Sequence, residues 1–265
     1  MPAVAPAGPP PETPPDIAGV MAALGQLLGL APSAVLRGRL ARSAALLPAL
    51  RHRPPAIDDP AWARLIDAVT VPETRLFRHP ALLESLAETV LPVLGAQAAS
   101  RPLQLVSAGC ATGEEAYSLG MLTLGAGLPA RVLGLDIARP GLAAAEAPCW
   151  PPGPPDPARD VPPRYRPLLE RSGGALRPCP ALRQALRFRR ANLLDPLPLR
   201  DADLILCRNV LIYMLPEART AVVAGLVAAL RPGGALVLGA TDSPPPGLGL
   251  EPWQPGSTAI WRRKS

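Results

Sequence analysis

Two short segments of the chain carry residues whose types and spacing could support chemistry. The first, Ser107 to Glu115, has the sequence S-A-G-C-A-T-G-E-E, and the second, Cys207 to Tyr213, has the sequence C-R-N-V-L-I-Y. Each lies where an apolar run ends and a helical pattern begins, as at the carboxyl end of a strand in an open α/β sheet. Cofactors and substrates bind at that edge of such sheets. We therefore expect both segments to line one binding site.

The glycines and carboxylates of the first segment indicate which ligands it accepts. Gly109 and Gly113 let the backbone of the turn approach a ligand closely. The loop lacks the G-x-G-x-x-G fingerprint of dinucleotide sites, so a dehydrogenase ranks last among the alternatives. The adjacent Glu114 and Glu115 would repel a pyrophosphate. They suit either a cationic ligand or the N-terminus of a helix, and the sequence leaves both interpretations open.

Two polar residues at the ends of later strands extend this site. Asp136 ends the second expected strand, where an acidic residue commonly accepts hydrogen bonds from ribose hydroxyls. Asn192 ends the third and offers an amide that could recognise an adenine edge. S-adenosylmethionine carries a ribose, an adenine and a positive sulfonium, and it has no phosphate. The pattern therefore predicts S-adenosylmethionine as the cofactor.

An alternation of strands and helices must hold these residues in place. Strands are expected at 103–107, 131–135, 186–191 and 204–207, and helices at 114–124, 139–145 and 217–230. This order predicts right-handed βαβ units on a parallel sheet. After a turn at Arg231 to Gly234, strands at 235–239 and 259–262 are expected to form an antiparallel hairpin at the sheet edge.

The N-terminal part of the chain has a different character. Residues 1–16 are rich in proline, which predicts a disordered tail. Residues 17–72 follow helical periodicity and are expected to form a small helical domain, with one helix at 60–69. Ser33 is expected to cap its second helix. That helix should bury Val35, Leu36, Leu40 and Leu47.

Residues 73–265 are expected to form a second domain that contains the sheet. A helix carrying Leu82, Leu83, Leu86 and Val90 leads into it and is expected to end near Pro92. The stretch at about 149–184 is rich in proline and arginine and interrupts the alternation of strands and helices. An insertion of this length is expected to be a subdomain, with short strands beside a Gly173-Gly174 turn.

Composition narrows the functional classes. The chain has 265 residues and a formal net charge of +6, which favours acidic partners. Aromatic residues make up only 3%, so nucleic-acid recognition through stacked bases is not expected. The four cysteines form no C-x-x-C pair, and we expect no metal site. Cys110 and Cys207 are interpreted as small buried hydrophobes. We find no signal peptide and no stretch that could span a bilayer, and we expect a cytoplasmic protein.

Five motifs together resemble a single family. They are Thr74 to Arg78 (T-R-L-F-R), Ser107 to Ser118 (S-A-G-C-A-T-G-E-E-A-Y-S), Asn192 to Leu194 (N-L-L), Cys207 to Tyr213 and Leu230 to Gly239 (L-R-P-G-G-A-L-V-L-G). In this order, over residues 20–263, the chain resembles the CheR family of chemotaxis-receptor glutamate O-methyltransferases. The resemblance implies an α/β fold of the class I S-adenosylmethionine-dependent methyltransferase (Rossmann-like) type. An N-terminal helical domain and an inserted small β-subdomain would accompany this sheet.

The resemblance also assigns roles to single residues. Arg78 and Tyr213 would be catalytic and would flank the reactive methyl group. Cofactor contacts are expected from Gly109 and Gly113 of the loop and, by resemblance, from Thr74, Arg78, Glu115, Asp136, Asn192, Leu193, Arg208 and Asn209. Arg37, Arg39 and Arg42 would dock an acidic receptor helix, although a solvated helix face explains them equally well. Pro72, Leu76 and Ala240 depart from the family pattern.

The resulting hypothesis is methyl transfer from S-adenosylmethionine to glutamate side chains of chemotaxis receptors, forming methyl esters in sensory adaptation. The expected partners are the cytoplasmic helices of chemoreceptors, to which a monomeric enzyme is recruited without inserting into the membrane or binding nucleic acid. Two alternatives stay open. One is a methyltransferase of the same fold that acts on another protein or a small molecule, and the other is a non-catalytic signalling module that binds the cofactor.

Overall fold

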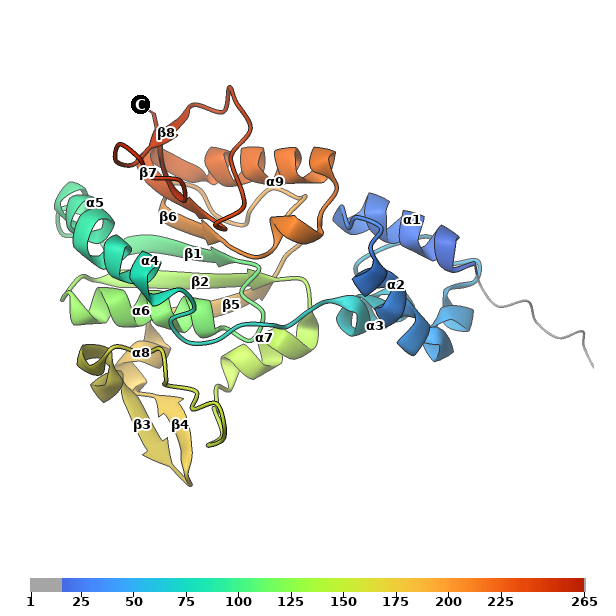
Figure 1. The fold of residues 1–265 in the computed structure, drawn as a ribbon, viewed down its shortest axis with the longest axis horizontal. Coiled ribbons are helices and arrows are strands. Elements are labelled where there is room, and N and C mark those ends of the chain that lie inside the picture. The colour runs from blue at the N-terminus through green and yellow to red at the C-terminus, as the bar shows by residue number, and fades with distance from the viewer. Residues whose placement is uncertain (1–15, 265) are drawn as a thin grey trace, which may run out of the picture.

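A mostly parallel sheet forms the centre of the protein (Figure 1). The computed structural model describes residues 16–264, so the predicted tail lies outside the described residues except for Asp16. The strands of the sheet are β1 (Leu103–Ala108), β2 (Ala130–Asp136), β5 (Leu186–Arg190), β6 (Ala202–Cys207), β7 (Leu230–Leu238), β8 (Leu250–Pro252) and β9 (Ile260–Arg263). Their order is β5-β2-β1-β6-β7-β9-β8, and β9 is antiparallel to both neighbours. These parallel pairings confirm the expected parallel α/β sheet.

Helices cover both faces of this sheet (Figure 1). They are α4 (Pro80–Ser85), the π-helix η2 (Leu86–Val90), α5 (Leu91–Ala98), α6 (Glu114–Gly125), α7 (Arg139–Glu146) and α9 (Pro216–Ala229). Leu103 and Leu105 of β1 share a hydrophobic cluster with α5 and α6, whereas Val106 and Ala108 share another with α9. Because side chains alternate along a strand, β1 is buried on both faces.

Three details of this part differ from the sequence expectations. The helix expected to end near Pro92 continues to Ala98, because the π-turn of η2 lets the Leu91 N–H bond to the Leu86 carbonyl just before the proline. The expected turn at Arg231 to Gly234 lies inside β7, where the pairing with β6 shifts register. The outermost strand is β8, since β9 pairs with both β7 and β8.

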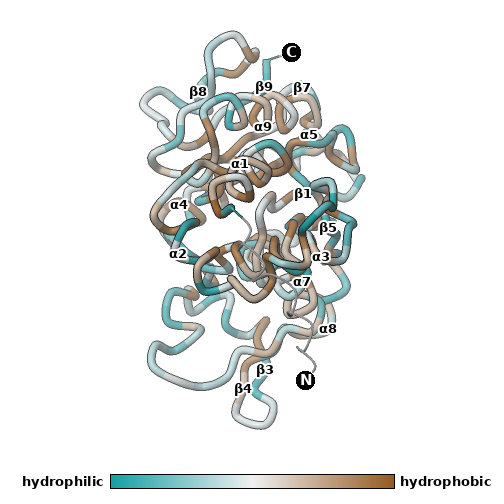
Figure 2. The backbone as a smooth tube through the Cα atoms, turned by 90° about the vertical axis from the view of Figure 1, so that its right-hand side faces the viewer, coloured by the Kyte–Doolittle hydropathy of each residue, from teal (hydrophilic) through white to brown (hydrophobic). Residues whose placement is uncertain are grey.

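The first part of the described chain is helical and lies beside the carboxyl edge of the sheet (Figure 1). Figure 2 views the protein from this end. The elements are α1 (Ile17–Leu28), α2 (Ala34–Arg42), the 3-10 helix η1 (Ala44–Leu50) and α3 (Pro60–Val69). Asp16, Ser33 and Asp59 cap α1, α2 and α3 with their side chains. Leu36 and Leu40 of α2 are buried as expected, but Val35 is 53% exposed. Leu47 is also buried, but α2 ends at Arg42, so Leu47 belongs to η1 and not to the second helix as expected.

These helices have a hydrophobic core of their own. Leu24, Leu40, Leu65 and Ile66 are fully buried in a cluster separate from those of the sheet. Polar contacts join the two parts, and among them the Asp67 Oδ2 accepts from both Nε and Nη2 of Arg139. The domain boundary between residues 72 and 73 stays a prediction.

Residues 149–184 leave the sheet after α7 and return at β5. This stretch contains the 3-10 helix η3 (Pro163–Leu168), β3 (Leu169–Ser172), β4 (Ala175–Pro178) and α8 (Pro180–Gln184). β3 and β4 form a separate antiparallel pair around the Gly173-Gly174 turn, at the bottom of Figure 1. Trp150 anchors the stretch, because its backbone bridges to Leu176 and its indole donates to Glu114. Its status as a subdomain stays a prediction.

A buried ion cluster stabilises the amino edge of the sheet. Asp203 of β6 is fully buried and receives a bidentate pair from Arg101, with both N···O distances at 2.7 Å. The Gln104 N–H and Arg231 Nε donate to the same carboxylate. Burial alone would raise the pKa of Asp203, but the donors from Arg101, Gln104 and Arg231 outweigh it and hold that pKa below its usual range.

An Asp203→Asn variant should therefore lose about 3 kcal/mol of unfolding free energy at neutral pH, because two arginines lose their charged partner. A folded-state pKa below the unfolded one means that the carboxylate stabilises the fold above the ordinary pKa of 3.8. This contribution disappears as the pH falls through the lower, folded-state pKa. Urea unfolding of the wild type and the variant across this pH range should show the difference between their unfolding free energies shrinking in acid. A difference that does not depend on pH would contradict this role of Asp203.

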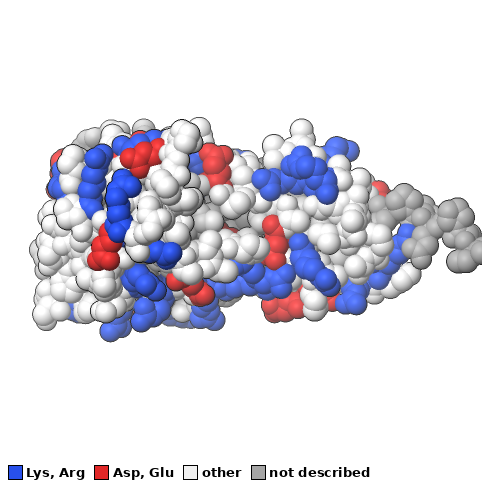
Figure 3. All heavy atoms as spheres, turned by 90° about the horizontal axis from the view of Figure 1, so that it is seen from below, with Lys and Arg blue, Asp and Glu red and all other residues white. Residues whose placement is uncertain are grey.

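Positive charge spreads over the face that carries β3 and β4 (Figure 3). In this view the blue Lys and Arg side chains cover more of the surface than the red acidic ones. Within residues 16–264, no helix is long and apolar enough to cross a membrane. The same residues contain no group of three or more His, Cys, Asp or Glu arranged to hold a metal ion.

Candidate active site

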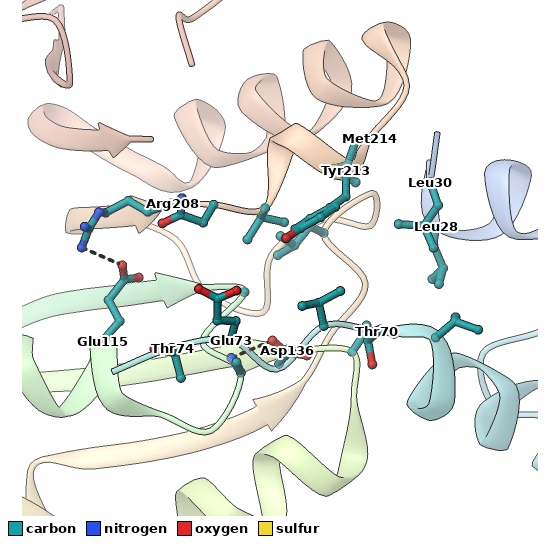
Figure 4. Close-up of a pocket in the computed structure, with 18 of the residues that line it drawn as sticks. Leu28, Leu30, Thr70, Glu73, Thr74, Glu115, Asp136, Arg208, Tyr213 and Met214 are labelled. Atoms are coloured by element: carbon teal, nitrogen blue, oxygen red, sulfur yellow. Dashed lines mark hydrogen bonds and ion pairs between the residues drawn. The ribbon is translucent and has the colours of Figure 1, made fainter. Parts of the chain in front are cut away.

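A pocket opens at the carboxyl ends of β1, β2 and β6, facing α1, α2 and α3 (Figure 4). Ten of the residues expected at the site line it: Thr74, Arg78, Gly109, Glu115, Asp136, Asn192, Leu193, Arg208, Asn209 and Tyr213. Gly113 is not among the lining residues, and a side chain there would meet Ala145 and Phe188. The wall contributed by the N-terminal helices is mainly apolar and includes Leu28, Leu30, Val35 and Leu36.

The two glutamates at the start of α6 have different partners. Glu115 lines the pocket and accepts from Ser107 Oγ at 2.8 Å and from Arg208 Nη1 at 3.2 Å. Glu114 turns away and accepts from the Trp150 indole N–H at 3.0 Å. Burial raises the pKa of Glu115, and the charge of Arg208 and the Ser107 hydroxyl oppose this shift. Glu115 is therefore the carboxylate of the pair that can face a cationic ligand.

Two backbone N–H groups, one from the loop after β1 and one just after β2, hold the Asp136 carboxylate in place. Its Oδ2 accepts from the Ala111 N–H at 2.8 Å, and its Oδ1 accepts from the Ala138 N–H at 2.9 Å. Burial raises the pKa of Asp136, and these N–H groups counteract the shift. Each oxygen keeps a second lone pair, so the carboxylate can still accept from a pair of ligand hydroxyls. Ile137, which the sequence analysis did not single out, adds an apolar surface beside it.

Gly109 brings the β1 loop into direct contact with the second motif. Its φ of +81° lies in the left-handed region, and a Cβ there would overlap Cγ2 of Val210. Val210 and Asn209 belong to the segment that follows β6, and both line the pocket. The two motifs are thus packed against each other at this glycine.

Arg208 joins three parts of the site. Its side chain is only 2% exposed, and besides Glu115 its Nη2 lies 2.7 Å from both the Arg78 carbonyl and the His79 Nδ1. Burial, followed by the charge of Arg208, lowers the pKa of His79. A neutral imidazole can accept at Nδ1, so Arg208 holds the Arg78 segment against β6. Sequence reasoning missed His79, because nothing in its spacing signals this contact.

Arg78 is placed by its buried neighbour Phe77. The Phe77 N–H donates to Ser118 Oγ of α6 at 2.9 Å, and its ring stacks on Tyr165. The Arg78 guanidinium bonds to Glu73, with 2.9 Å to its carbonyl and 3.4 Å to its Oε1. The Arg78 Nε is buried and has no hydrogen-bond partner in the described part of the chain. The Arg78 side chain as a whole is 21% exposed and lines the pocket, so the accessible part of its guanidinium can still donate to a further acceptor.

The Asn192 amide joins two elements. Its Nδ2 donates to the Leu27 carbonyl of α1 at 2.9 Å, and its Oδ1 accepts from the Leu194 N–H at 3.3 Å. Each polar atom of the amide has one protein partner and keeps a second N–H or lone pair, so the expected contact with adenine stays a prediction. Leu193 and Ile137 offer the apolar pocket surface on which a base could lie.

Tyr213 reaches the pocket from the short 3-10 helix η4 (Leu211–Tyr213), and Figure 4 shows its ring extending into the cavity. The linker between α1 and α2 holds this segment on both sides. The Ala31 N–H donates to the Tyr213 carbonyl at 2.8 Å, and the Leu215 N–H donates to the Gly29 carbonyl at 2.7 Å. Leu30 and Met214 form an isolated antiparallel bridge between these bonds. The helical part of the chain thus positions Tyr213.

A Gly29→Ala variant should disturb this arrangement. Gly29 has a φ of +70°, and an added Cβ would overlap the Cβ of Ala218 on α9. We expect the linker to move and to carry Tyr213 with it, so that a reaction needing Tyr213 slows roughly tenfold. Ala218→Gly in the same chain should restore most of the rate, at about 1 kcal/mol of helix stability. Rates of methyl transfer for the single and double variants test this, and a double variant as slow as Gly29→Ala would contradict it.

The remaining expected residues lie elsewhere. Arg37 and Arg42 are exposed on α2, whereas Arg39 donates to the Thr70 carbonyl at 2.7 Å. Successive residues of a helix turn by about 100°, so Arg37 and Arg39 point to nearly opposite sides. Cys110 and Cys207 are buried, and burial raises the pKa of both thiols. Both cysteines therefore behave as the small hydrophobes expected from the sequence.

Comparison with known proteins shows what this chain is similar to. The family model described as CheR methyltransferase, SAM binding domain, matches residues 72–246. A chemotaxis protein methyltransferase of Vibrio parahaemolyticus is 33% identical over an alignment of 186 residues, and the match covers 67% of this chain and 67% of that protein.

Two further relatives are longer than this chain. A probable biofilm formation methyltransferase, WspC, of Pseudomonas putida is 36% identical, with 67% of this chain and 43% of that protein covered. An uncharacterized 104.1 kDa protein of Rhodobacter capsulatus is also 36% identical, with 68% of this chain and 20% of that protein covered. The chain thus spans from a fifth to about two thirds of the length of the relatives named here.

Proposed function

The chain belongs to the CheR methyltransferase family, and from this premise we propose that it methylates glutamate side chains of chemoreceptors with S-adenosylmethionine as donor. The family match confirms the predicted fold class and cofactor. The observation that best supports the reaction is the pocket itself. Arg78 and Tyr213 meet there with the carboxylates of Glu115 and Asp136.

The residues of the pocket fit the cofactor. Asp136 has lone pairs for ribose hydroxyls, and Glu115 provides negative charge for the cationic methionyl part. Leu193 and Ile137 supply apolar surface for the adenine. The partly exposed Arg78 guanidinium, which lines the pocket, offers donors for an anionic group. When bound, S-adenosylmethionine supplies a methyl group that its sulfonium makes electrophilic.

The protein's part in the reaction is mainly to position the acceptor. A glutamate side chain has a pKa near 4.3, so it is already ionised at neutral pH and needs no general base. We assign Arg78 and Tyr213 to orient this carboxylate toward the methyl group. The Arg78 guanidinium also bonds to the Glu73 carbonyl, which limits how tightly it pairs with the acceptor. Very tight pairing would stabilise the reactants as much as the transition state.

The apolar wall of the pocket contributes through its effect on solvent. The positive donor and the negative carboxylate neutralise each other as the new bond forms, so the transition state is less polar than the reactants. Leu28, Leu30, Val35 and Met214 would exclude water from this reaction. Val35 was expected to lie in the core but is exposed, and its position on the pocket wall accounts for this exposure.

We also propose that Arg37 and Arg42 help to dock an acidic receptor helix near the pocket. Both are exposed on α2, whose residues Val35 and Leu36 line the cavity. Attraction between exposed charges is screened by salt. Binding of receptor fragments should therefore weaken as the ionic strength rises, and binding that is insensitive to salt would argue against this role.

Methyl transfer to membranes tests the choice of receptor. Tritiated donor and the purified chain are incubated with membranes of the source organism that contain or lack chemoreceptors. We expect label only where receptors are present. The similarity to a biofilm formation methyltransferase makes an acceptor used in biofilm formation the second candidate. Label that persists in membranes without chemoreceptors would favour this second candidate.

A further inference from the structure

Glu73 places a glutamate carboxylate of the chain itself on the wall of the pocket, next to Arg78. It lines the same pocket as Arg78, Asp136 and Tyr213. In Figure 4 its carboxylate stands on one wall of the cavity, below the ring of Tyr213. The side chain is 71% exposed. A group of the same chemical type as the proposed substrate thus lies beside the residues assigned to orient that substrate.

The backbone of Glu73 is held more firmly than its carboxylate. The Glu73 carbonyl accepts from Arg78 Nη1 at 2.9 Å, which fixes the residue next to the guanidinium. The contact from Glu73 Oε1 to Arg78 Nη2 is 3.4 Å, long for a hydrogen bond between charged groups. Exposed pairs of this kind contribute little stability. The carboxylate can therefore change rotamer while the residue stays at the pocket.

We propose that Glu73 is itself a methyl acceptor, an inference that rests on the function proposed above. An oxygen of its ionised carboxylate forms the bond to the methyl carbon, and the bond from that carbon to sulfur breaks. The electron pair of the broken bond stays on sulfur, which leaves a neutral thioether and a neutral methyl ester. No proton moves and no other reactant is needed. Because the acceptor belongs to the same chain, its effective concentration at the pocket is high.

Methylation of Glu73 would also change Arg78. The ester carries no negative charge, so the ion pair between Glu73 and Arg78 is lost. The guanidinium is then available to an incoming receptor carboxylate. Before self-methylation, the Glu73 carboxylate would compete with a receptor glutamate for Arg78. Self-methylation would remove this competition, so that the pocket could bind the receptor glutamate.

Mass spectrometry of the full chain tests this proposal. The purified protein is incubated with donor carrying a trideuterated methyl group and is then digested with pepsin in acid, because methyl esters hydrolyse in base. We expect the label on Glu73, whereas the exposed Glu88 of η2 serves as an internal control and stays unlabelled. A Glu73→Gln variant, which changes an exposed side chain, should fold normally and carry no label.

Adding a receptor fragment to the same reaction tests self-methylation and receptor methylation independently, because label on the fragment and label on Glu73 are measured separately. Label on the receptor fragment without label on Glu73 would overturn self-methylation and leave receptor methylation standing. Label on neither would overturn both. Dilution tests whether the transfer occurs within one chain. The fraction of chains labelled per minute should be independent of protein concentration, and a rate that falls in proportion to dilution would overturn the proposal.

Discussion

Replacing Gly109 with alanine is expected to weaken S-adenosylmethionine binding about a hundredfold, because forcing an extra methyl group into a packed site costs about 1–3 kcal/mol and about 1.4 kcal/mol is a tenfold change in affinity. The new Cβ would overlap Cγ2 of Val210, so the β1 loop or the segment after β6 must move. Both line the pocket, and Asn209 would shift with Val210. Isothermal titration calorimetry of the wild type and the variant measures the loss.

A matched control isolates the clash from the backbone strain. Gly127 also has a left-handed φ, +66°, but a Cβ there would meet nothing within 4 Å. Gly127→Ala should therefore cost about 1 kcal/mol of stability and leave cofactor binding intact. Val210→Ala completes a double-mutant cycle with Gly109→Ala and should restore much of the affinity. Normal binding by Gly109→Ala alone would refute the tight contact between the two motifs.

Replacing Arg78 with alanine is expected to lower kcat for methyl transfer about a hundredfold, because the acceptor carboxylate would lose the group that we propose orients it. The guanidinium faces the pocket, but Asp136 and Glu115 lie on other elements and keep their partners. Cofactor affinity should therefore fall far less than kcat. Steady-state rates with a receptor fragment, together with calorimetry, separate the two effects.

The controls for Arg78 address charge and geometry. Arg78→Lys keeps the positive charge but lacks the planar guanidinium with its paired N–H donors. Its rate should therefore lie between those of Arg78→Ala and the wild type. Arg64→Ala removes an exposed arginine of α3 that donates to its own helix at the Pro60 carbonyl, and it should leave the rate unchanged. Near-normal transfer by Arg78→Ala would exclude Arg78 from the catalytic group.

The site could be anticipated wherever it depends on strand ends. Gly109 follows β1, Asp136 ends β2 and Arg208 follows β6, and these strands are adjacent and parallel. The carboxyl ends of parallel strands share one edge, so apolar runs and their terminal polar residues were enough to bring these positions together. The absence of a phosphate-binding fingerprint likewise pointed to the correct cofactor.

Contacts between distant side chains could not be anticipated in this way. The adjacent glutamates 114 and 115 have the same sequence signal, yet Trp150 draws one away from the pocket. The Asn192 amide binds the Leu27 carbonyl, a partner 165 positions away along the chain. His79 accepts from Arg208 only because the fold closes the Arg78 segment over β6. Each of these depends on packing between elements, which local patterns do not encode.

Some backbone details were not predicted because the chain departs at these positions from rules that hold for most proteins. Proline usually ends a helix, but the π-turn before Pro92 removes the conflict and the helix continues. Glycines at 233 and 234 usually mark a turn, yet here they form an irregularity within β7. Val35 follows the helical repeat of a buried residue and instead faces the pocket. In the last case the deviation coincides with the candidate site.

The most direct test of the account is the chemical nature of the methylated product. A chemoreceptor fragment is incubated with the chain and a methyl-labelled donor, and the product is digested in acid and mapped by mass spectrometry. We predict label on glutamate side chains that is released as methanol by mild base, as expected of a carboxyl methyl ester. Label that resists base, or that maps to lysine, arginine or another nucleophile, would contradict the assignment of this chain as a protein-glutamate O-methyltransferase.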